Sequence, residues 1–310
     1  MADFATTVTD ETELDADEIT KFEEGVIFGY TPELVVDQVA TVRSQAAAKT
    51  IQFAKYANLS LITSRITDGE EVASVVLADS TATLSPVEYG NAITLQKSAD
   101  VQSGFKAGAA AGFLVGRNAG ASLDKLAMTA LEGFSTTQIW PNGKTATTQL
   151  TDSDVLDSAF AHRLHNKLAR LNVPGINGGM YVGIAHEDLL YDLKMDAGAA
   201  GWTEVNKYAN PDNVLMNEVG MFAGIRWLRS SNATITSDGG SGTTDSYEVQ
   251  VVGFNALGRG DASPLEVLIR PGYDKLDRFV NYGWKWTGAY GIIDTANMVQ
   301  GICASSIGSN

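Results

Sequence analysis

The residues best suited to chemistry are three histidines and the acids beside one of them. His162 and His165 are three residues apart in an expected helix, and His186 is followed directly by Glu187 and Asp188. Imidazole and carboxylate groups can hold a hydrolytic zinc ion. The zinc-binding helix signature, however, needs two histidines four residues apart with a glutamate between them, and the sequence lacks it. A metal-assisted hydrolase using His162, His165 and Asp188 therefore remains only an alternative.

Two glycine-rich stretches are the other candidates for chemistry. Residues 239–242 contain Ser241, but they lack the strand, strained turn and helix that expose a nucleophilic serine. Residues 253–260 do not match the dinucleotide fingerprint, and the sequence has no phosphate-binding loop with lysine and serine or threonine. The sequence thus assigns no catalytic residue, no cofactor-binding residue and no metal ligand.

Composition limits the class of protein and its partners. With 310 residues, 44% of them apolar, the chain can build one large or two modest domains. A net charge of −15 argues against a surface that grips nucleic acid or anionic membranes. The best apolar run, 107–116, is shorter than the ~18 residues needed to span a bilayer, and acids rather than an export signal follow Met1. Because Cys303 is the only cysteine, a disulfide framework within the chain and a multi-cysteine metal site are both excluded.

A long helix is the element around which the other elements are expected to be arranged. Glycines recur every four residues from Gly104 to Gly120, and leucines and alanines continue at steps of three and four to Phe134. Each interior glycine costs a helix about 1 kcal/mol relative to alanine, so another backbone is expected to pack closely along this face. That backbone belongs either to the same subunit or to a neighbour, and the sequence does not separate these alternatives. A leucine at Gly112 is expected to block assembly if the neighbour packs there.

The N-terminal third has few apolar residues for a core of its own. Residues 1–24 hold nine acids and one lysine, a net charge of −8, and form either a solvated tail or an arm that orders on another chain. Residues 32–42 show a short helical pattern, and residues 51–55 alternate as a strand. Residues 58–96 predict the long irregular strands of a hairpin, with turns at 67–70 and 85–86. Such a hairpin is marginal alone, so it is expected to lie on another surface.

The second half interleaves helices and strands. Thr151 and Asp154 form a capping box, flanked by a hydrophobic staple, that predicts the start of a helix running to Leu171. Tyr282, Trp284, Trp286 and Tyr290 share one face of a long final strand at 278–293. Shorter strands are expected at 180–185, 221–228, 247–254 and 265–269, a helix at 186–194, and turns or loops at 140–144, 198–202 and 236–244, the last being a flexible tip. The fold class expected is α+β rather than doubly wound α/β.

This order of elements resembles the tailed-phage major capsid proteins of the Hong Kong 97 (HK97) fold, and more specifically their N4-like family. The resemblance covers about residues 30 to 300, and its motifs are short but occur in the family's order. They are Pro32, Glu33, Leu34, Val35, Asp37 and Gln38; Lys49, Thr50, Ile51, Phe53 and Tyr56; Tyr89 and Gly90; Tyr181 to His186 with Asp188, Leu189, Asp192 and Leu193; Gly201 and Trp202; and Glu218, Val219, Gly220, Gly224, Ile225 and Arg226.

The resemblance implies an HK97-like division of the chain. Its parts would be an N-arm at 1–48, an extended E-loop hairpin at 49–98, a P domain with the long spine helix at 99–144, an α/β A domain at 145–272, the long strand of the P domain at 273–293, and the A-domain return with the C-terminus at 294–310. The loop at 236–244 would lie near a five-fold or six-fold axis.

The resemblance also implies a function. It is that of a major capsid protein which self-assembles as pentamers and hexamers into the icosahedral head of a tailed double-stranded DNA bacteriophage. The implied partners are further copies of the chain, portal and scaffolding proteins, a decoration protein as an optional addition, and packaged DNA bound without sequence specificity. The implied location is the virion, after synthesis in the bacterial cytoplasm, with no membrane, no enzymatic activity and no cofactor. An encapsulin-like nanocompartment shell is the alternative of the same fold.

One departure from the fold's type member concerns covalent crosslinking. That member joins an E-loop lysine to an asparagine of another subunit. Here residues 56–96 contain no lysine, and Lys55 and Lys97 stand only at the base of the loop. We therefore expect a shell held together by noncovalent contacts.

Overall fold

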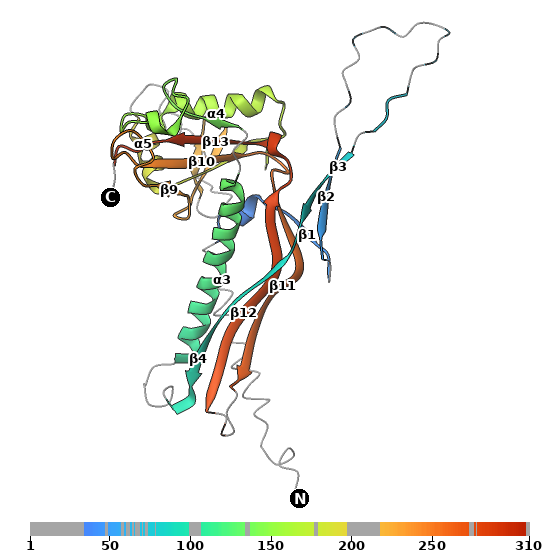
Figure 1. The fold of residues 1–310 in the computed structure, drawn as a ribbon, viewed down its shortest axis with the longest axis vertical. Helices are drawn as coiled ribbons and strands as arrows, with labels where there is room; N and C mark the ends of the chain where they lie inside the picture. The colour runs from blue at the N-terminus through green and yellow to red at the C-terminus, as the bar shows by residue number, and fades with distance from the viewer. Residues whose placement is uncertain are drawn as a thin grey trace, which may run out of the picture.

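The computed structural model describes residues 34–46, 49–56, 74–77, 79–98, 107–133, 137–176, 179–196, 218–272 and 278–307, with single positions at 59, 63, 65, 69, 71 and 276. Expectations for residues 1–33, for Gly104 and for the loop at 198–202 fall outside the described residues. The mixed α+β class is confirmed, with two larger sheets, a two-stranded sheet and three α-helices among the described residues. Figure 1 shows a rounded upper part and a long, narrow lower part.

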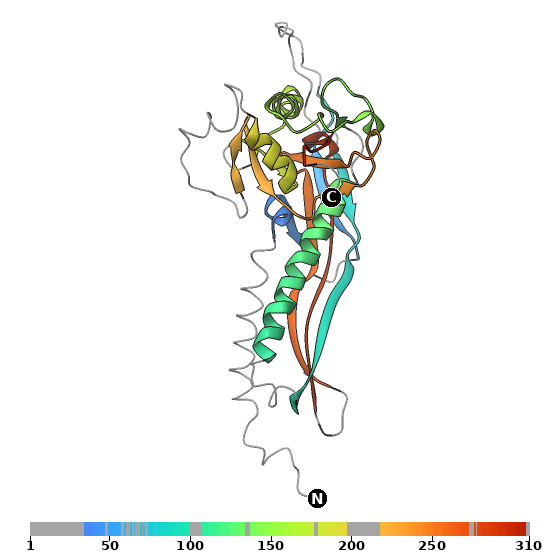
Figure 2. The same cartoon turned by 90° about the vertical axis from the view of Figure 1, so that its left-hand side faces the viewer.

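The expected long helix is present as α3, Ala107–Glu132. Its first half packs against the lower sheet, where Val115, Ala119 and Leu123 meet Trp284 and Trp286. Its last turns lie beneath the upper sheet, where Ala127, Met128 and Leu131 pack against the strands. Figure 2 shows the helix running along the lower sheet and ending under the upper part. A single helix thus joins the two parts of the subunit.

The glycine ladder is buried within the isolated subunit. Gly112, Gly116 and Gly120 are all buried, and a side chain at Gly108 would meet the Tyr282 hydroxyl at 3.3 Å. Of the two alternatives for the ladder, its burial in one chain favours internal packing. The expectation that a leucine at Gly112 acts mainly on assembly is revised accordingly.

The lower sheet has four strands in the order β1-β11-β12-β4. The expected last long strand is β12, Phe279–Ile292, and its even-numbered aromatic side chains do share the face that packs on α3. Its neighbour β11 spans Leu257–Pro271, three times the length expected, because two register shifts between Asp261 and Glu266 interrupt the alternation that the sequence pattern relies on. The edge strand β1, Thr41–Ser44, runs parallel to β11.

The expected hairpin at 58–96 is organised differently. Strand β2, Ile51–Tyr56, pairs with β3, Asp79–Leu84, whereas β4, Val87–Gln96, leaves this pair and joins β12 in the lower sheet. Pro86 marks the passage from one sheet to the other, since proline lacks the N–H that a continued ladder needs. The pair β2–β3 projects away from the body in Figure 1.

The base of this projection packs on the body of the subunit, in agreement with the expectation that the hairpin lies on another surface. Ile51, Phe53 and Leu84 are buried against the end of β12. Gly258 and Gly260 make this possible, since a side chain at either would lie 3.2 Å or less from Phe53 or Ile51. The two glycines of β11 therefore leave the space in which the side chains of β2 pack.

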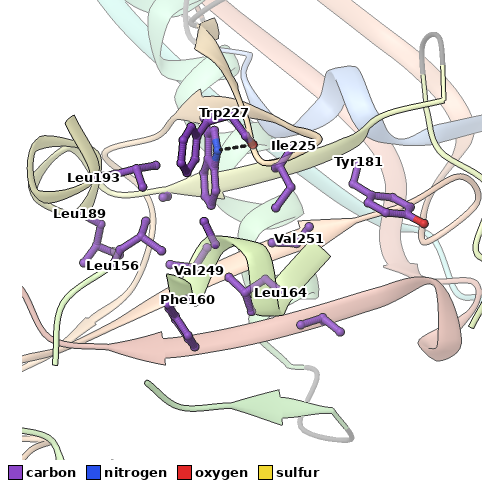
Figure 3. Close-up of a cluster of buried hydrophobic side chains, with 14 of the residues drawn as sticks. Leu156, Phe160, Leu164, Tyr181, Leu189, Leu193, Ile225, Trp227, Val249 and Val251 are labelled. Carbon is purple, nitrogen blue, oxygen red and sulfur yellow. Dashed lines mark hydrogen bonds between the residues drawn. The ribbon is translucent and has the colours of Figure 1, made fainter. Parts of the chain in front are cut away.

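The upper sheet has the path β5-β13-β10-β6-β8-β7, and β9 pairs with β10 outside that path. Its strands are β5 Gln138–Ile139, β6 Tyr181–Ala185, β7 Glu218–Phe222, β8 Ile225–Arg229, β9 Ile235–Thr236, β10 Ser246–Val252 and β13 Met298–Cys303. One face packs on the helices α4, Ser158–Arg170, and α5, Glu187–Met195, around Trp227 and Phe160, as Figure 3 shows. The other packs on the end of α3 and on a 3-10 helix, η3, Val36–Val39. Burial on both faces accounts for the near-continuous apolar run of β6.

The strand expected at 221–228 is a hairpin instead. Strands β7 and β8 are joined by Ala223 and Gly224, whose φ angles of 54° and 76° give the two left-handed positions of a tight hairpin turn. Sequence patterns predict such turns from asparagine, aspartate or glycine in the first position, so the alanine found here does not indicate a turn. The helix pattern at 32–42 likewise yields only η3 before the chain enters β1, and β13 was not expected as a strand.

The capping box at Thr151 and Asp154 exists but does not begin the helix. The carboxylate of Asp154 accepts hydrogen bonds from the backbone N–H and hydroxyl of Thr151 at 2.8 Å, which closes a local turn. Helix α4, Ser158–Arg170, begins later, with Asp157 as its N-cap accepting from the Phe160 N–H. Both segments have an acceptor at cap spacing, and the helix opens at the second one, where Leu156 and Phe160 are buried in the core.

The loop at 236–244 is a turn as expected, but it is held in place rather than free. Ser241 donates its backbone N–H to the Leu150 carbonyl at 2.7 Å, and the Thr244 hydroxyl donates to Asp152 at 2.7 Å. Two hydrogen bonds to the segment before α4 remove the freedom that its glycines suggest. Three further 3-10 or α elements complete the described chain: η4 Thr147–Gln149, α5 Glu187–Met195 and η5 Thr295–Asn297.

Candidate functional site

The two helix histidines both make aromatic contacts in this structure. His162 is exposed at the surface of α4, with its ring 5.7 Å from that of Phe222. His165 lies against Tyr181, with ring centroids 5.3 Å apart, and fills the space above Gly224. Burial, and then the nearby His162, lower the pKa of His165. A neutral imidazole in an apolar contact is the expected state there.

His186 and Asp188 contact each other at the start of α5, whereas His162 and His165 lie on α4. His186 is the N-cap of α5, and its Nδ1 atom accepts from the Asp188 N–H at 3.3 Å. The Tyr247 hydroxyl donates to Asp188 at 3.0 Å, and burial together with that bond raises the pKa of Tyr247. These three side chains fix the start of α5 on β10. Among the described residues, no three histidine, cysteine or acidic side chains are placed to share a metal ion.

A cleft of about 470 Å³ lies between α3 and the strands β4 and β12. Two of its lining residues are joined to each other: the side-chain oxygen of Asn118 accepts a hydrogen bond from the Trp284 indole N–H at 3.0 Å. Lys125 is the positively charged residue in the lining of the cleft, and its ammonium group donates a hydrogen bond to the backbone carbonyl of Asn232 at 3.0 Å. The cleft therefore presents an amide and aromatic lining without a pair of groups for acid–base chemistry.

Exposed apolar side chains gather on the projection instead. Beyond the β2–β3 pair, Val75, Val76 and Leu77 are 69%, 87% and 60% exposed, and Tyr56 at the end of β2 is 63% exposed. Exposed apolar side chains in a row are unfavourable in water and mark contact surfaces. Among the described residues, the projection thus carries a run of apolar side chains that is poorly suited to solvent.

A buried charged network holds the chain where it enters the body. Arg259 on β11 donates to Asp37 at 2.8 Å and to Asp261 at 2.9 Å, and Asp37 also accepts from the Tyr290 hydroxyl at 2.7 Å. The guanidinium lies 5.5 Å from the Trp286 ring centroid. Burial pushes the pKa of Arg259 down, but Tyr290 and the two carboxylates outweigh burial and keep it above its ordinary value. The network joins η3, β11 and β12.

A second buried carboxylate holds the same segment from the other side. Asp124 of α3 is 1% exposed and accepts from the backbone N–H groups of Val35 and Val36 at 2.9 and 2.7 Å. Its other oxygen accepts from the Asn232 amide at 2.8 Å. Burial raises the pKa of Asp124, although these three hydrogen bonds oppose the shift. Asp124 caps η3 and fixes the chain on the middle of α3.

Sequence reasoning assigned no role to Asp37, Asp124 or Arg259. The available signal was Asp124 itself, an acid between Leu123 and Leu126 in the apolar half of a helix. Such a residue needs a buried partner. Its partners lie 88 and 108 positions away, so the sequence pattern does not name them.

Comparison with solved structures identifies the architecture. The capsid of Ralstonia phage GP4 superimposes with a TM-score of 0.69 over 86% of this chain and 87% of its own, at 13% identity. The head structure of Helicobacter pylori bacteriophage KHP40 gives 0.64 over 89% and 90%, at 10% identity. The chain has the fold of a phage capsid subunit. Its capsid fold includes both the rounded upper part and the long lower part, since the match spans nearly the whole of each chain.

The capsid fold also occurs in a particle with a different origin. The virus-like particle from Pyrococcus furiosus matches with a TM-score of 0.56 over 91% of this chain and 98% of its own, at 9% identity. No protein-family model matches the sequence, and a comparison with curated proteins found no match. No described helix is long and apolar enough to cross a membrane.

Proposed function

We propose that this chain is the major capsid protein of a tailed double-stranded DNA bacteriophage and that many copies build its icosahedral head. The observation that carries the proposal is the similarity to phage capsid structures over 86–90% of the chain. A match limited to the upper sheet would support only a general α+β domain, whereas coverage of 86–90% extends well beyond that sheet. The N4-like relationship rests on the short sequence motifs given above.

The division of the chain follows from this proposal. Residues 1–48 form the N-arm, 49–98 the E-loop, 99–144 and 273–293 the P domain, and 145–272 with 294–310 the A domain. The pairing of β4 with β12 supports a modified E-loop, because residues 87–96 belong to the lower sheet with α3. The E-loop segment between the paired strands β2 and β3 then comprises residues 57–78 of the sequence.

Assembly into a shell would account for the exposed apolar side chains of the projection, which are unfavourable in a monomer. Val75, Val76 and Leu77 are exposed on the projection, and assembly with further copies removes such side chains from water at about 25 cal/mol for each Å² buried. Closed symmetry allows one chain to cover a large surface with repeated contacts. The same shell interacts with portal and scaffolding proteins, and with a decoration protein where one is present. The protein is made in the bacterial cytoplasm and ends in the virion.

The net charge of −15 suits a container for DNA. A wall that bound phosphate tightly would slow a genome that slides in during packaging, and an acidic wall avoids the counterion release that drives such binding. DNA is accordingly enclosed without sequence-specific contacts, and the protein performs no chemistry of its own.

Electron microscopy of the purified protein tests this proposal. Expressed alone or with its scaffolding partner, the chain should form closed shells or five- and six-membered rings, which size-exclusion chromatography separates from small oligomers. A chain that stays a monomer or small oligomer under both conditions would contradict the capsid assignment and reopen the hydrolase alternative.

A nanocompartment shell is the second candidate, favoured by the similarity to the Pyrococcus furiosus particle. Both candidates predict particles, but the contents differ. Particles isolated from the natural source should contain nuclease-protected DNA in the first case and a co-purifying enzyme in the second. The ratio of absorbance of nucleic acid to that of protein decides between them.

A further inference from the structure

The outer face of α4 carries a row of uncompensated positive charge. Arg163, Lys167 and Arg170 are all exposed, and the helix Ser158–Arg170 contains no aspartate or glutamate. Within the part of the chain that the structure describes, none of the three side chains makes an ion pair. We call these three residues the basic stripe. It stands out in a chain with 37 acids and 22 lysines and arginines.

Spacing places the three cations on one face. They are separated by four and then three residues, so they follow one side of the helix over about 10 Å at a rise of 1.5 Å per residue. Neighbouring like charges at these spacings destabilise a helix. Lys167 and Arg170 partly compensate this through the helix dipole, because they occupy the last turn, but Arg163 lies before that turn. An anionic partner would relieve the repulsion along the whole stripe.

The position of α4 determines which partner can reach it. Helix α4 covers the face of the upper sheet opposite the one that packs on α3 and η3. Figure 1 shows it at the far side of the upper part from α3. The N-terminal segment of the same chain joins the body at Leu34 and η3, on the other face. A partner supplied by another molecule therefore meets the stripe more directly than the chain's own N-terminal segment.

We infer that the basic stripe binds the acidic N-terminal segment, residues 1–24, of another copy of the chain. This inference rests on the proposed function, since an assembling shell supplies that segment in equal number to the stripes. The segment holds nine acids and one lysine. Glu11, Glu13, Asp15 and Asp17 alternate, and in an extended chain such residues follow each other at about 7 Å on one side. Arg163 and Lys167 are about 6 Å apart along the helix, which matches.

DNA is the competing anion, and the charge balance disfavours it. Three cations on a subunit of net charge −15 would release few counterions while the rest of the surface repels phosphate. The acidic segment carries more than half of that negative charge, so docking it on the stripe reduces the repulsion between copies. The stripe thus acts as a contact between copies.

Charge exchange tests the inference in assembling protein. The triple variant Arg163→Glu, Lys167→Glu, Arg170→Glu should reduce the yield of closed particles at least tenfold at low salt. Glutamates in the last turn oppose the helix dipole, so the free subunit should melt at a somewhat lower temperature than the wild type but remain folded at the temperature of assembly. The matched control Arg163→Lys, Lys167→Arg, Arg170→Lys keeps the charge and should assemble like the wild type. Lysines in place of Glu11, Glu13, Asp15 and Asp17, added to the glutamate variant, should restore particles. Normal assembly of the glutamate variant would overturn the inference while leaving the capsid assignment intact.

Carbodiimide coupling identifies the occupant directly. In particles made from mixed light and nitrogen-15 chains, Lys167 should form amide bonds with acids of residues 1–24, and mixed-isotope pairs should occur. Crosslinks within single chains only, or to acids outside residues 1–24, would overturn it. So would a glutamate variant that assembles normally but loses packaged DNA, because the stripe would then face nucleic acid. If the wild type forms no particles, the proposed function itself fails.

Discussion

The guanidinium of Arg259 donates a 2.8 Å hydrogen bond to the carboxylate of Asp37 and so ties the lower sheet to a segment 222 residues away in the sequence. Both side chains are nearly buried, at 12% and 14% exposure. Asp124 holds the adjoining Val35 and Val36 from α3. Two buried carboxylates thus determine where the chain leaves the body toward its N-terminus. This attachment fixes the position of Leu34 on the body, and the N-terminal segment that precedes Leu34 continues from that point.

Replacing Arg259 with methionine should strongly destabilise the subunit. The change leaves the carboxylates of Asp37 and Asp261 buried beside each other without their cation, which costs about 3–5 kcal/mol. Chemical unfolding of the unassembled subunit measures the loss. Arg229→Met is the matched control, because the Arg229–Glu187 pair is about half exposed and worth less than about 1 kcal/mol. Equal losses in the two variants would show that the Arg259 network does not hold the fold.

Asp124 should give the subunit a specific dependence on pH. Burial raises its pKa in the folded protein above the ordinary value of 3.8, so the folded state holds the proton more tightly than the unfolded chain. This contribution to the free energy of unfolding is fully present below pH 3.8 and is lost as pH rises through the elevated folded pKa.

Asp124→Asn tests that dependence, because the amide oxygen still accepts from Val35 and Val36 but the side chain no longer titrates. Relative to the wild type, the variant should gain stability as pH rises above 3.8 and through the raised folded pKa of Asp124. Urea unfolding at several pH values measures the difference. A constant difference across this range would mean that Asp124 does not titrate there.

Gly112→Leu should destabilise the free subunit rather than act only on assembly. Gly112 is buried in the single chain, and forcing a large side chain into a packed interface costs about 1–3 kcal/mol. Ala110→Leu lies on an exposed position of the same helix and should change stability by less than about 0.5 kcal/mol. Thermal unfolding of both unassembled variants provides the comparison. If Gly112→Leu melts like the wild type but forms no shells, the ladder packs against a neighbour after all.

Mature particles should contain no covalent links between subunits. The projecting segment lacks lysine between Lys55 and Lys97, and Lys55 is paired with Asp294 of its own chain at 2.5 Å. Boiling in detergent should therefore release a single species of 32.9 kDa on a denaturing gel. A ladder of higher multiples would require a lysine donor elsewhere in the chain.

Local patterns in the sequence were sufficient for elements that are periodic over many residues. The steps of three and four that continue through Leu123 and Leu131 gave α3, and the even-numbered aromatics from Tyr282 to Tyr290 gave the buried face of β12. Such patterns work because one face of an element meets the core, whatever the partner is. The order of these elements, with short motifs, was enough to indicate a capsid fold, and the structural comparisons support that fold.

The tertiary structure alone decided which segments pair and where each element ends. Pairing of β4 with β12 rather than β3, the start of α4 at Ser158, and the turn at Ala223 each depend on contacts between distant residues. The same holds for Asp124, which as a sequence position is only an acid in a helix and in the fold is the cap of η3. Hydrogen-bond partners and strand register are nonlocal, and neighbouring residues carry no information about them. The sequence by itself therefore determined the elements and their order, and packing determined their connections.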